Sequence, residues 1–171
     1  MTEPELRPAA PADAPRLAEV MAESLETYRS FAGPGFSPPT AEEIAAEITP
    51  RLGRPTVWCE LAESHGVMAG YVSMVPATEA RLPSDDPLLM HFWMLFVRAP
   101  WWGTGLAARL HGDACAEAAA RGFTAMRLFT PALQARARRF YEREGWHLAG
   151  GPHPHEAMQI EIVEYRRSLA A

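Results

Sequence analysis

The chain has 171 residues, of which 48% are hydrophobic and 22% charged, and its formal net charge is −5. This length suffices for one sizeable core, so we expect a single domain over residues 1–171. No apolar run approaches the roughly 20 residues of a spanning helix, and the acidic start lacks the basic residues of a secretory signal. We therefore expect a cytoplasmic protein with no membrane partner. The negative charge also argues against general binding to nucleic acid.

Residue types that often bind metals are few and poorly placed in this sequence. Cys59 and Cys115 each lie in an apolar segment, which favours reduced packing cysteines over a disulfide or a metal pair, with a catalytic thiol as the minor alternative. His153 and His155 flank a proline and have no third ligand at a recognisable spacing. We interpret them as part of a solvated loop and expect no metal site.

Hydrophobic periodicity and capping residues predict the elements of the first half of the chain. Asp13 is the predicted N-cap of a first helix. Thr40 and Glu43 form the capping-box pattern of a second helix, which Pro50 is expected to end soon afterwards. A short polar link with hairpin chemistry joins two strands. The predicted elements are a strand at 5–8, a helix from residue 13, a helix at 40–48, and strands at 56–62 and 67–75.

The second half alternates strands and helices. The continuous apolar run 88–97 is typical of a central strand covered on both faces. A helix at 107–121 follows, with Gly122 at its C′ position, and the strand at 124–130 is predicted to run parallel to 88–97 through a right-handed crossover. A basic helix at 134–144 and two strands at 146–149 and 157–165 complete the order β-α-α-β-β-β-α-β-α-β-β.

The turn Gly103-Thr104-Gly105 joins the central strand to the following helix and is a candidate anion site. Glycines let backbone N–H groups approach a ligand, and the first turn of a helix has unsatisfied donors at the positive end of its dipole. A dinucleotide-binding fold would need an acidic residue roughly 20 positions later, where residues 127–130 supply none, and the Gly-Lys-Ser/Thr of a P-loop is absent. A tight turn without a ligand remains the alternative.

A second motif stands at the matching distance. The segment Gln134-x-x-Ala137-x-x-Phe140-Tyr141-Glu142-Arg143-Glu144-Gly145-Trp146, together with 95–97 and 103–107, resembles the GCN5-related N-acetyltransferase (GNAT) superfamily. The resemblance covers residues from about 88 to 146. It implies an α/β (α+β) GNAT fold: a mixed, mostly antiparallel sheet of six to seven strands, splayed between strands 4 and 5 and flanked by four helices. It also implies an acetyl-CoA site.

The resemblance implies a set of coenzyme-binding residues. Backbone groups of Phe96, Val97 and Arg98 would pair with the pantetheine arm as an added strand. The pyrophosphate would be held by N–H groups of Gly103, Thr104, Gly105, Leu106 and Ala107.

The same resemblance marks the residues that flank this set. Trp102 stands where the family has Gln or Arg, and Pro100 is displaced from the family's usual position. Gln134 stands where the family has asparagine and is a candidate pantetheine contact. The four arginines of the basic helix either reach the ribose phosphate or form a solvated face, and Arg138 and Arg139 are the first to test: Arg136, Arg138, Arg139 and Arg143.

Two residues are catalytic candidates. Tyr141 matches the tyrosine that many family members place near the sulfur as an acid, and its alternative is a core aromatic bonded to the backbone. His91 lies six residues before Val97, on what alternation predicts to be the same strand face, where some members carry a glutamate base. A histidine pKa near 6.5 would let it take a proton directly or through water, and a buried core histidine is the alternative.

The acceptor pocket is expected between the first two helices and the central strands, and its walls are variable among proteins of this fold. Two functions remain: an acetyl-CoA-dependent N-acetyltransferase acting on a primary amine of a small molecule, peptide or protein, or a catalytically silent acyl-CoA-binding domain. The sequence leaves the oligomeric state open, a homodimer included. The candidate acceptor residues are Tyr28, Phe31, Tyr71, Ser73 and Trp93.

Overall fold

The computed structural model describes residues 3–169, and in this range the predicted order of strands and helices is confirmed. Short 3-10 turns, including η2 (Thr27–Ser30) and η4 (Ala99–Trp101), interrupt the longer elements. These are β1 (Glu5–Pro8), α1 (Ala14–Glu26), α2 (Ala41–Leu52), β2 (Trp58–Ser64), β3 (Val67–Pro76), β4 (Leu89–Val97), α3 (Leu106–Ala120), β5 (Ala125–Pro131), α4 (Ala135–Arg143), β6 (His147–His155) and β7 (Ile160–Ser168).

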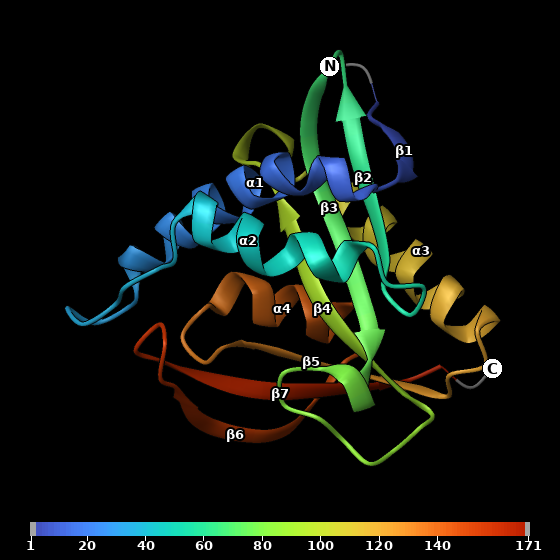
Figure 1. The fold of residues 1–171 in the computed structure, drawn as a ribbon. Coiled ribbons are helices and arrows are strands. Elements are labelled where there is room, and N and C mark those ends of the chain that lie inside the picture. Colours follow the sequence, from blue (N-terminus) through green and yellow to red (C-terminus); the bar gives the residue numbers. More distant parts are fainter. Residues whose placement is uncertain (1–2, 170–171) are drawn as a thin grey trace.

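The strands of the described residues form one sheet in the order β1-β2-β3-β4-β5-β7-β6. Every neighbouring pair is antiparallel except β4 and β5, which are parallel as predicted. The β4–β5 ladder has only three residue pairs, from Leu89↔Ala125 to His91↔Arg127. Beyond His91 the strands separate, and Figure 1 shows β2 to β4 running steeply while β5, β6 and β7 cross below them. The predicted splay between strands 4 and 5 is confirmed.

A β-bulge in β4 changes which side chains share a face. Ser73 of β3 pairs with Met94, whereas the next residue of β3 pairs with Phe92, so Trp93 is an extra residue without a partner. An extra residue reverses the alternation of the strand. Phe92 therefore packs in one core cluster while Met94 and Phe96 pack in the other.

The bulge corrects one prediction. Val97 packs with the cluster of α3, whereas His91 is two residues from Trp93 on the side of α2, where the Arg51 charge acts on it. His91 and Val97 do not share a strand face, because the alternation predicted from sequence assumes an uninterrupted strand.

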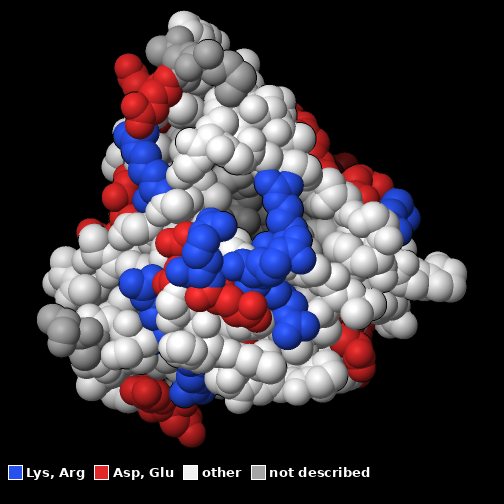
Figure 2. All heavy atoms as spheres, turned by 180° about the vertical axis from the view of Figure 1, so that it is seen from behind, with Lys and Arg blue, Asp and Glu red and all other residues white. Residues whose placement is uncertain are grey.

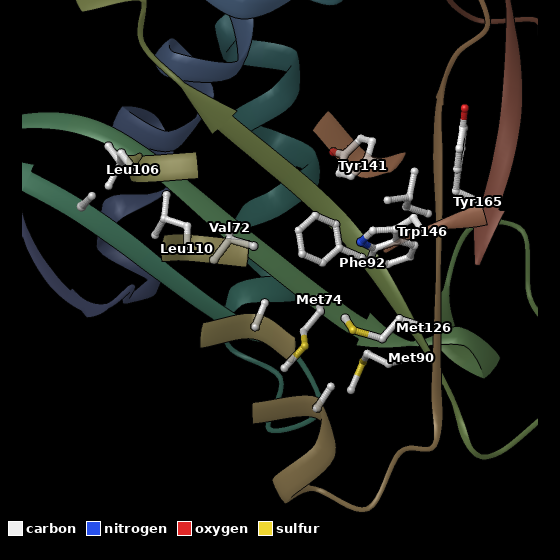
Figure 3. Close-up of a cluster of buried hydrophobic side chains, with 14 of the residues drawn as sticks. Val72, Met74, Met90, Phe92, Leu106, Leu110, Met126, Tyr141, Trp146 and Tyr165 are labelled. Carbon is white, nitrogen blue, oxygen red and sulfur yellow. The ribbon is translucent and has the colours of Figure 1, made fainter. Parts of the chain in front are cut away.

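The sheet carries a hydrophobic core on each face. On one face α1 and α2, which lie in front of the sheet in Figure 1, cover Leu61, Tyr71 and Met94. On the other face α3 and α4 cover a cluster in which Figure 3 shows the rings of Phe92, Tyr141 and Trp146 lying together. Both faces of β4 are thus covered, as its continuous apolar sequence indicates.

Two predicted helix boundaries differ from the structure. Asp13 stands at the N-cap position of α1, but its carboxylate accepts hydrogen bonds from Arg7 and from the Ala10 N–H instead of capping the helix. Pro50 lies inside α2, which continues to Leu52 because that side chain is buried in the core. Packing of the last turn outweighs the hydrogen bond that proline cannot donate.

His153 and His155 belong to β6, so their interpretation as a solvated loop is wrong. The pairing of β6 with β7 orders this segment, although its glycines and prolines favour a loop. Within residues 3–169, none of the helices has the length and apolar character that crossing a membrane requires.

Candidate functional site

The separation of β4 from β5 leaves one edge of β4 unpaired from Phe92 onward. Its other edge stays bonded to β3 as far as Val97. An unpaired edge presents N–H and C=O groups that can bond an extended ligand as an added strand. On the face behind that of Figure 1, Figure 2 shows a hollow rimmed by basic side chains, all arginines because the sequence contains no lysine.

The start of α3 lies directly after β4 and short turn η4. Gly103 and Gly105 have φ values of +78° and +89°, a conformation that favours glycine. Gly105 is the N-cap and no side chain caps the helix, whose first backbone bond runs from the Arg109 N–H to the Gly105 carbonyl. The Thr104 hydroxyl and the Thr104 N–H both donate to the Trp101 carbonyl, over 2.7 and 3.4 Å.

This arrangement fits a phosphate group. The N–H groups of Leu106, Ala107 and Ala108 have no intrahelical acceptor, since the first turn of a helix leaves such donors free. The dipole of a 15-residue helix adds positive potential at the same place. A phosphate or pyrophosphate would satisfy both.

Gly70 of β3 pairs with Val97 at the end of β4, and the sequence analysis did not identify it. A Cβ atom at Gly70 would lie 2.6 Å from the Phe96 carbonyl oxygen, so β3 and the end of β4 approach closely only because this residue is glycine. A glycine inside a predicted strand was the signal that could have found it.

The end of β4 is held by specific contacts. The Arg98 N–H donates to the Ala69 carbonyl over 2.9 Å, and the Arg98 guanidinium pairs with Glu23 of α1. The Arg98 side chain therefore faces α1, and its backbone carbonyl accepts from the Trp101 N–H over 3.0 Å. Trp102 is 43% exposed, and its indole N–H donates to the Val97 carbonyl over 2.6 Å.

Tyr141 of α4 lies beside the gap, where Figure 3 shows its ring with Phe92 and Trp146. The Tyr141 ring meets those of Phe92 and Trp146 edge-on, with centroids 6.3 and 6.0 Å apart. Burial raises the pKa of Tyr141, and Tyr28 raises it further. The hydroxyl stays protonated at neutral pH and can donate a hydrogen bond.

Tyr28 of η2 and Gln134, the N-cap residue of α4, lie close together although they are far apart in the sequence. The Gln134 side chain forms a hydrogen bond with the Tyr28 hydroxyl, and the Thr130 hydroxyl lies 3.5 Å from the Gln134 amide oxygen. Burial raises the pKa of Tyr28 to about 12, although the bond to Gln134 opposes this change. Sequence predicted Tyr28 and Gln134 separately, as an acceptor wall and a coenzyme contact, and gave no signal for Thr130.

His91 lies at the base of the gap, opposite Arg127. Its ring stands 5.6 Å from that of Phe129, and its Nδ1 is buried without a partner among the described residues. Burial, followed by the charge of Arg127, lowers the pKa of His91 to about 3. A group with so low a pKa is a weak base near pH 7, which disfavours the base role.

The predicted acceptor residues separate into two groups. Tyr71 and Ser73 are fully buried under α1, and their assignment to the acceptor wall stays a prediction. Trp93 is half-buried at the bulge with the Arg51 guanidinium 5.0 Å from its ring centre. Phe31 contacts Tyr28 at a ring distance of 5.2 Å.

A pocket of about 140 Å³ opens beside Phe31, between the segment after η2, the end of β5 and the β6–β7 hairpin. Leu133 and Ile160 supply apolar wall, and Glu161 is its only charged residue. Its lining is Phe31, Ala32, Gly33, Pro131, Leu133, Gln159, Ile160 and Glu161.

The arginines of α4 have different surroundings. Arg138 donates to the Tyr165 hydroxyl and to the Ala132 carbonyl, each over 2.9 Å, so it holds α4 against the sheet. Arg143 pairs with Glu144. Arg139 is exposed, and the Arg136 guanidinium lies 3.8 Å from the centre of the Trp102 ring.

Known proteins share both the sequence pattern and the fold. The family model described as the acetyltransferase (GNAT) family matches residues 18–146. The acetyltransferase of the GNAT family from Streptococcus pneumoniae is 20% identical, with a TM-score of 0.70 over 98% of this chain and 100% of that chain. PaiA N-acetyltransferase from Thermoplasma acidophilum, solved with coenzyme A, is 16% identical, with a TM-score of 0.69 over 96% and 98%.

The ribosomal-protein-S18-alanine N-acetyltransferase from Escherichia coli is 15% identical, with a TM-score of 0.67 over 98% of this chain and 95% of that chain. At these identities the likeness establishes the fold. No curated protein matches the sequence.

Proposed function

Because the chain belongs to the acetyltransferase (GNAT) family, we propose that it is a single-domain, acetyl-CoA-dependent N-acetyltransferase that acetylates a primary amine by direct transfer. One observation carries the proposal: the uncapped, glycine-led start of α3 follows immediately on the strand edge that the splay leaves open. The similar structure solved with coenzyme A supports the choice of cosubstrate.

The coenzyme would bind first along the open edge of β4 and then at the start of α3. The backbone of Phe96 and Val97 would hold the pantetheine arm at the open edge of β4, whereas that of Arg98 is bonded to Ala69 and Trp101. The N–H groups of Gly103, Gly105, Leu106 and Ala107 would hold the pyrophosphate, while that of Thr104 is bonded to the Trp101 carbonyl. The Gln134 amide, already bonded to Tyr28, would border the arm on the side of β5.

The chemistry requires that the neutral amine nitrogen attack the thioester carbonyl, that the C–S bond break with the sulfur leaving as a thiolate, and that the nitrogen lose a proton to solvent. A thiol pKa of about 8.5 makes this leaving group good. The ordinary tyrosine pKa is already about 10, so full proton transfer from Tyr141 to the thiolate is uphill by more than ~2 kcal/mol. Tyr141 therefore stabilises the departing sulfur by donating a hydrogen bond. A backbone N–H near Val97 is the candidate donor to the carbonyl oxygen.

Deprotonation of the amine is assigned to solvent. His91, with its pKa lowered to about 3, holds no useful proton affinity at pH 7. The neutral fraction of the amine then limits the rate, because alkylamines are mostly protonated near neutral pH. The rate at subsaturating amine should rise with pH until it reaches the pKa of the amine used.

The experiment is an assay of thiol release on mixing the protein with acetyl-CoA and a panel of small amines and peptides. Because the sequence contains no lysine, acetylation of its own lysine side chains cannot contribute to the signal. Calorimetry with CoA is measured in parallel. CoA binding with turnover on an amine supports the proposal. Binding without turnover across a broad panel would favour the silent acyl-CoA-binding domain.

A further inference from the structure

The contact between Trp102 and Arg136 joins two segments on opposite sides of the gap between β4 and β5. Trp102 belongs to the loop before α3, and its indole lies back against the end of β4. Arg136 is in the first turn of α4, which follows β5. The two strands diverge beyond His91, so this stacked pair bridges the segments that follow them.

Trp102 and Arg136 are both exposed. In their present contacts, the Val97 carbonyl and the Arg136 guanidinium are engaged by Trp102 instead of by a ligand. The indole N–H donates to the Val97 carbonyl, which is one of the hydrogen-bond acceptors at the open edge of β4. Arg136 forms no ion pair within residues 3–169, and its described interaction is the stack on Trp102. Of the three other arginines on α4, Arg138 is bonded into the protein and Arg143 is paired with Glu144. Arg139 is exposed, and no contact in the described residues ties it to the loop before α3.

We propose that Trp102 and Arg136 form a latch that coenzyme binding exchanges for new contacts. Entry of the pantetheine arm displaces the indole from the Val97 carbonyl, and Arg136 leaves the ring to pair with a phosphate of the coenzyme. This inference rests on the proposed function, because it assigns residues to the same site. It makes Arg136, rather than Arg138, the arginine reserved for the anion.

Energetics favour this exchange. A cation stacked on an exposed ring and a neutral hydrogen bond are each weak contacts. A guanidinium bonded to phosphate is charge-assisted and geometrically matched, and therefore stronger than the stack it replaces. The latch opens when phosphate is present and closes without it.

The first test measures CoA affinity by calorimetry for wild type and Arg136→Gln, with Arg143→Gln as the matched control on the same helix. The expected result is a weakening of about tenfold for Arg136→Gln and less than about twofold for Arg143→Gln. S-acetylpantetheine, which carries none of the coenzyme's phosphates, should bind Arg136→Gln no more weakly than wild type. Equal weakening in both variants would reduce the effect to general charge and overturn the latch.

The second test isolates the indole N–H with Trp102→Phe, which keeps a ring for the stack and removes the donor. Stopped-flow association with S-acetylpantetheine should be several-fold faster than for wild type, because the Val97 carbonyl is then free. An unchanged association rate would overturn the displacement step. Thermal unfolding of each variant checks that it folds, and Trp102→Leu replaces Trp102→Phe if it does not.

A third measurement needs no coenzyme. The fluorescence of Trp102 is taken as the difference between the spectra of wild type and Trp102→Phe. It should change with Arg136→Gln and not with Arg143→Gln. Identical spectra for wild type and Arg136→Gln would contradict the stack. Loss of the latch leaves the proposed function standing if wild type binds CoA. Failure of wild type to bind CoA would overturn the proposed function and the latch together.

Discussion

The N-termini of α2 and α3 satisfy their backbone donors in different ways. At α2, the Glu43 N–H donates to the Thr40 hydroxyl and the Thr40 N–H donates to the Glu43 carboxylate, so the helix start is capped from within. At α3, the N-cap is Gly105 and no side chain takes part. A helix that caps itself needs no ligand, whereas an uncapped start next to an open strand edge retains donors for one.

The largest expected effect comes from closing the uncapped end. Gly105→Val places a β-branched residue at a φ of +89°, and the resulting shift of the backbone turns the N–H groups away from the phosphates. We expect the affinity for CoA to fall by about a hundredfold or more, measured by calorimetry.

Gly122→Val is the matched control, since Gly122 ends the same helix with a φ of +88°. It should lower the melting temperature similarly while CoA affinity stays within about twofold. If both variants lose CoA to the same extent, the effect reflects damage to α3 and not the anion site.

Tyr141→Phe tests whether the site beyond the uncapped helix performs chemistry. Removing the hydroxyl should lower turnover by about tenfold to a hundredfold while the affinity for CoA changes little. Tyr71→Phe removes another buried hydroxyl, which donates to the Met94 sulfur, and should leave turnover nearly unchanged. Unaltered turnover in Tyr141→Phe would dismiss its role at the sulfur.

The contact between Glu60 of β2 and Asp113 of α3 should add a pH dependence to stability. Burial, followed by the charge of Asp113, raises the pKa of Glu60 from 4.5 to about 7. Because the folded-state pKa is the higher one, the stability that Glu60 contributes is fully present below pH 4.5 and lost as pH rises through 7. Glu60→Gln should therefore stabilise the protein by ~1–2 kcal/mol above pH 7, after allowance for solvent screening.

The measurement is urea unfolding at pH 5 and pH 8. Glu19→Gln, an exposed change on α1, serves as the control and should alter neither value. If Glu60→Gln and wild type lose the same free energy of unfolding between pH 5 and pH 8, Glu60 is not the source of the pH dependence.

The smallest effect is expected at the capped end. Thr40→Ala removes one reciprocal bond of α2 and should cost ~1 kcal/mol, or roughly 2–4 °C in melting temperature. CoA affinity should not change, because α2 packs on the opposite face of the sheet from α3. A weaker CoA affinity in this variant would show that the two helix starts are not independent.

Sequence alone predicted much of the local architecture. Alternation, capping residues and turn glycines specified the element order, the hairpin between the strands at 56–62 and 67–75, and Gly122 just after the end of α3. These features depend on bonds between residues close in the chain, which is why local patterns report them. The glycine turn after β4 belongs to the same class.

Tertiary structure decided what the sequence pattern could not contain. The bulge at Trp93 reversed the faces of β4, and packing under α1 enclosed Tyr71 and Ser73. The Trp102–Arg136 stack joins residues that come from separate elements. Each outcome depends on the separation of two strands and on which side chains then fill the space, and such long-range packing leaves no periodic trace in one sequence.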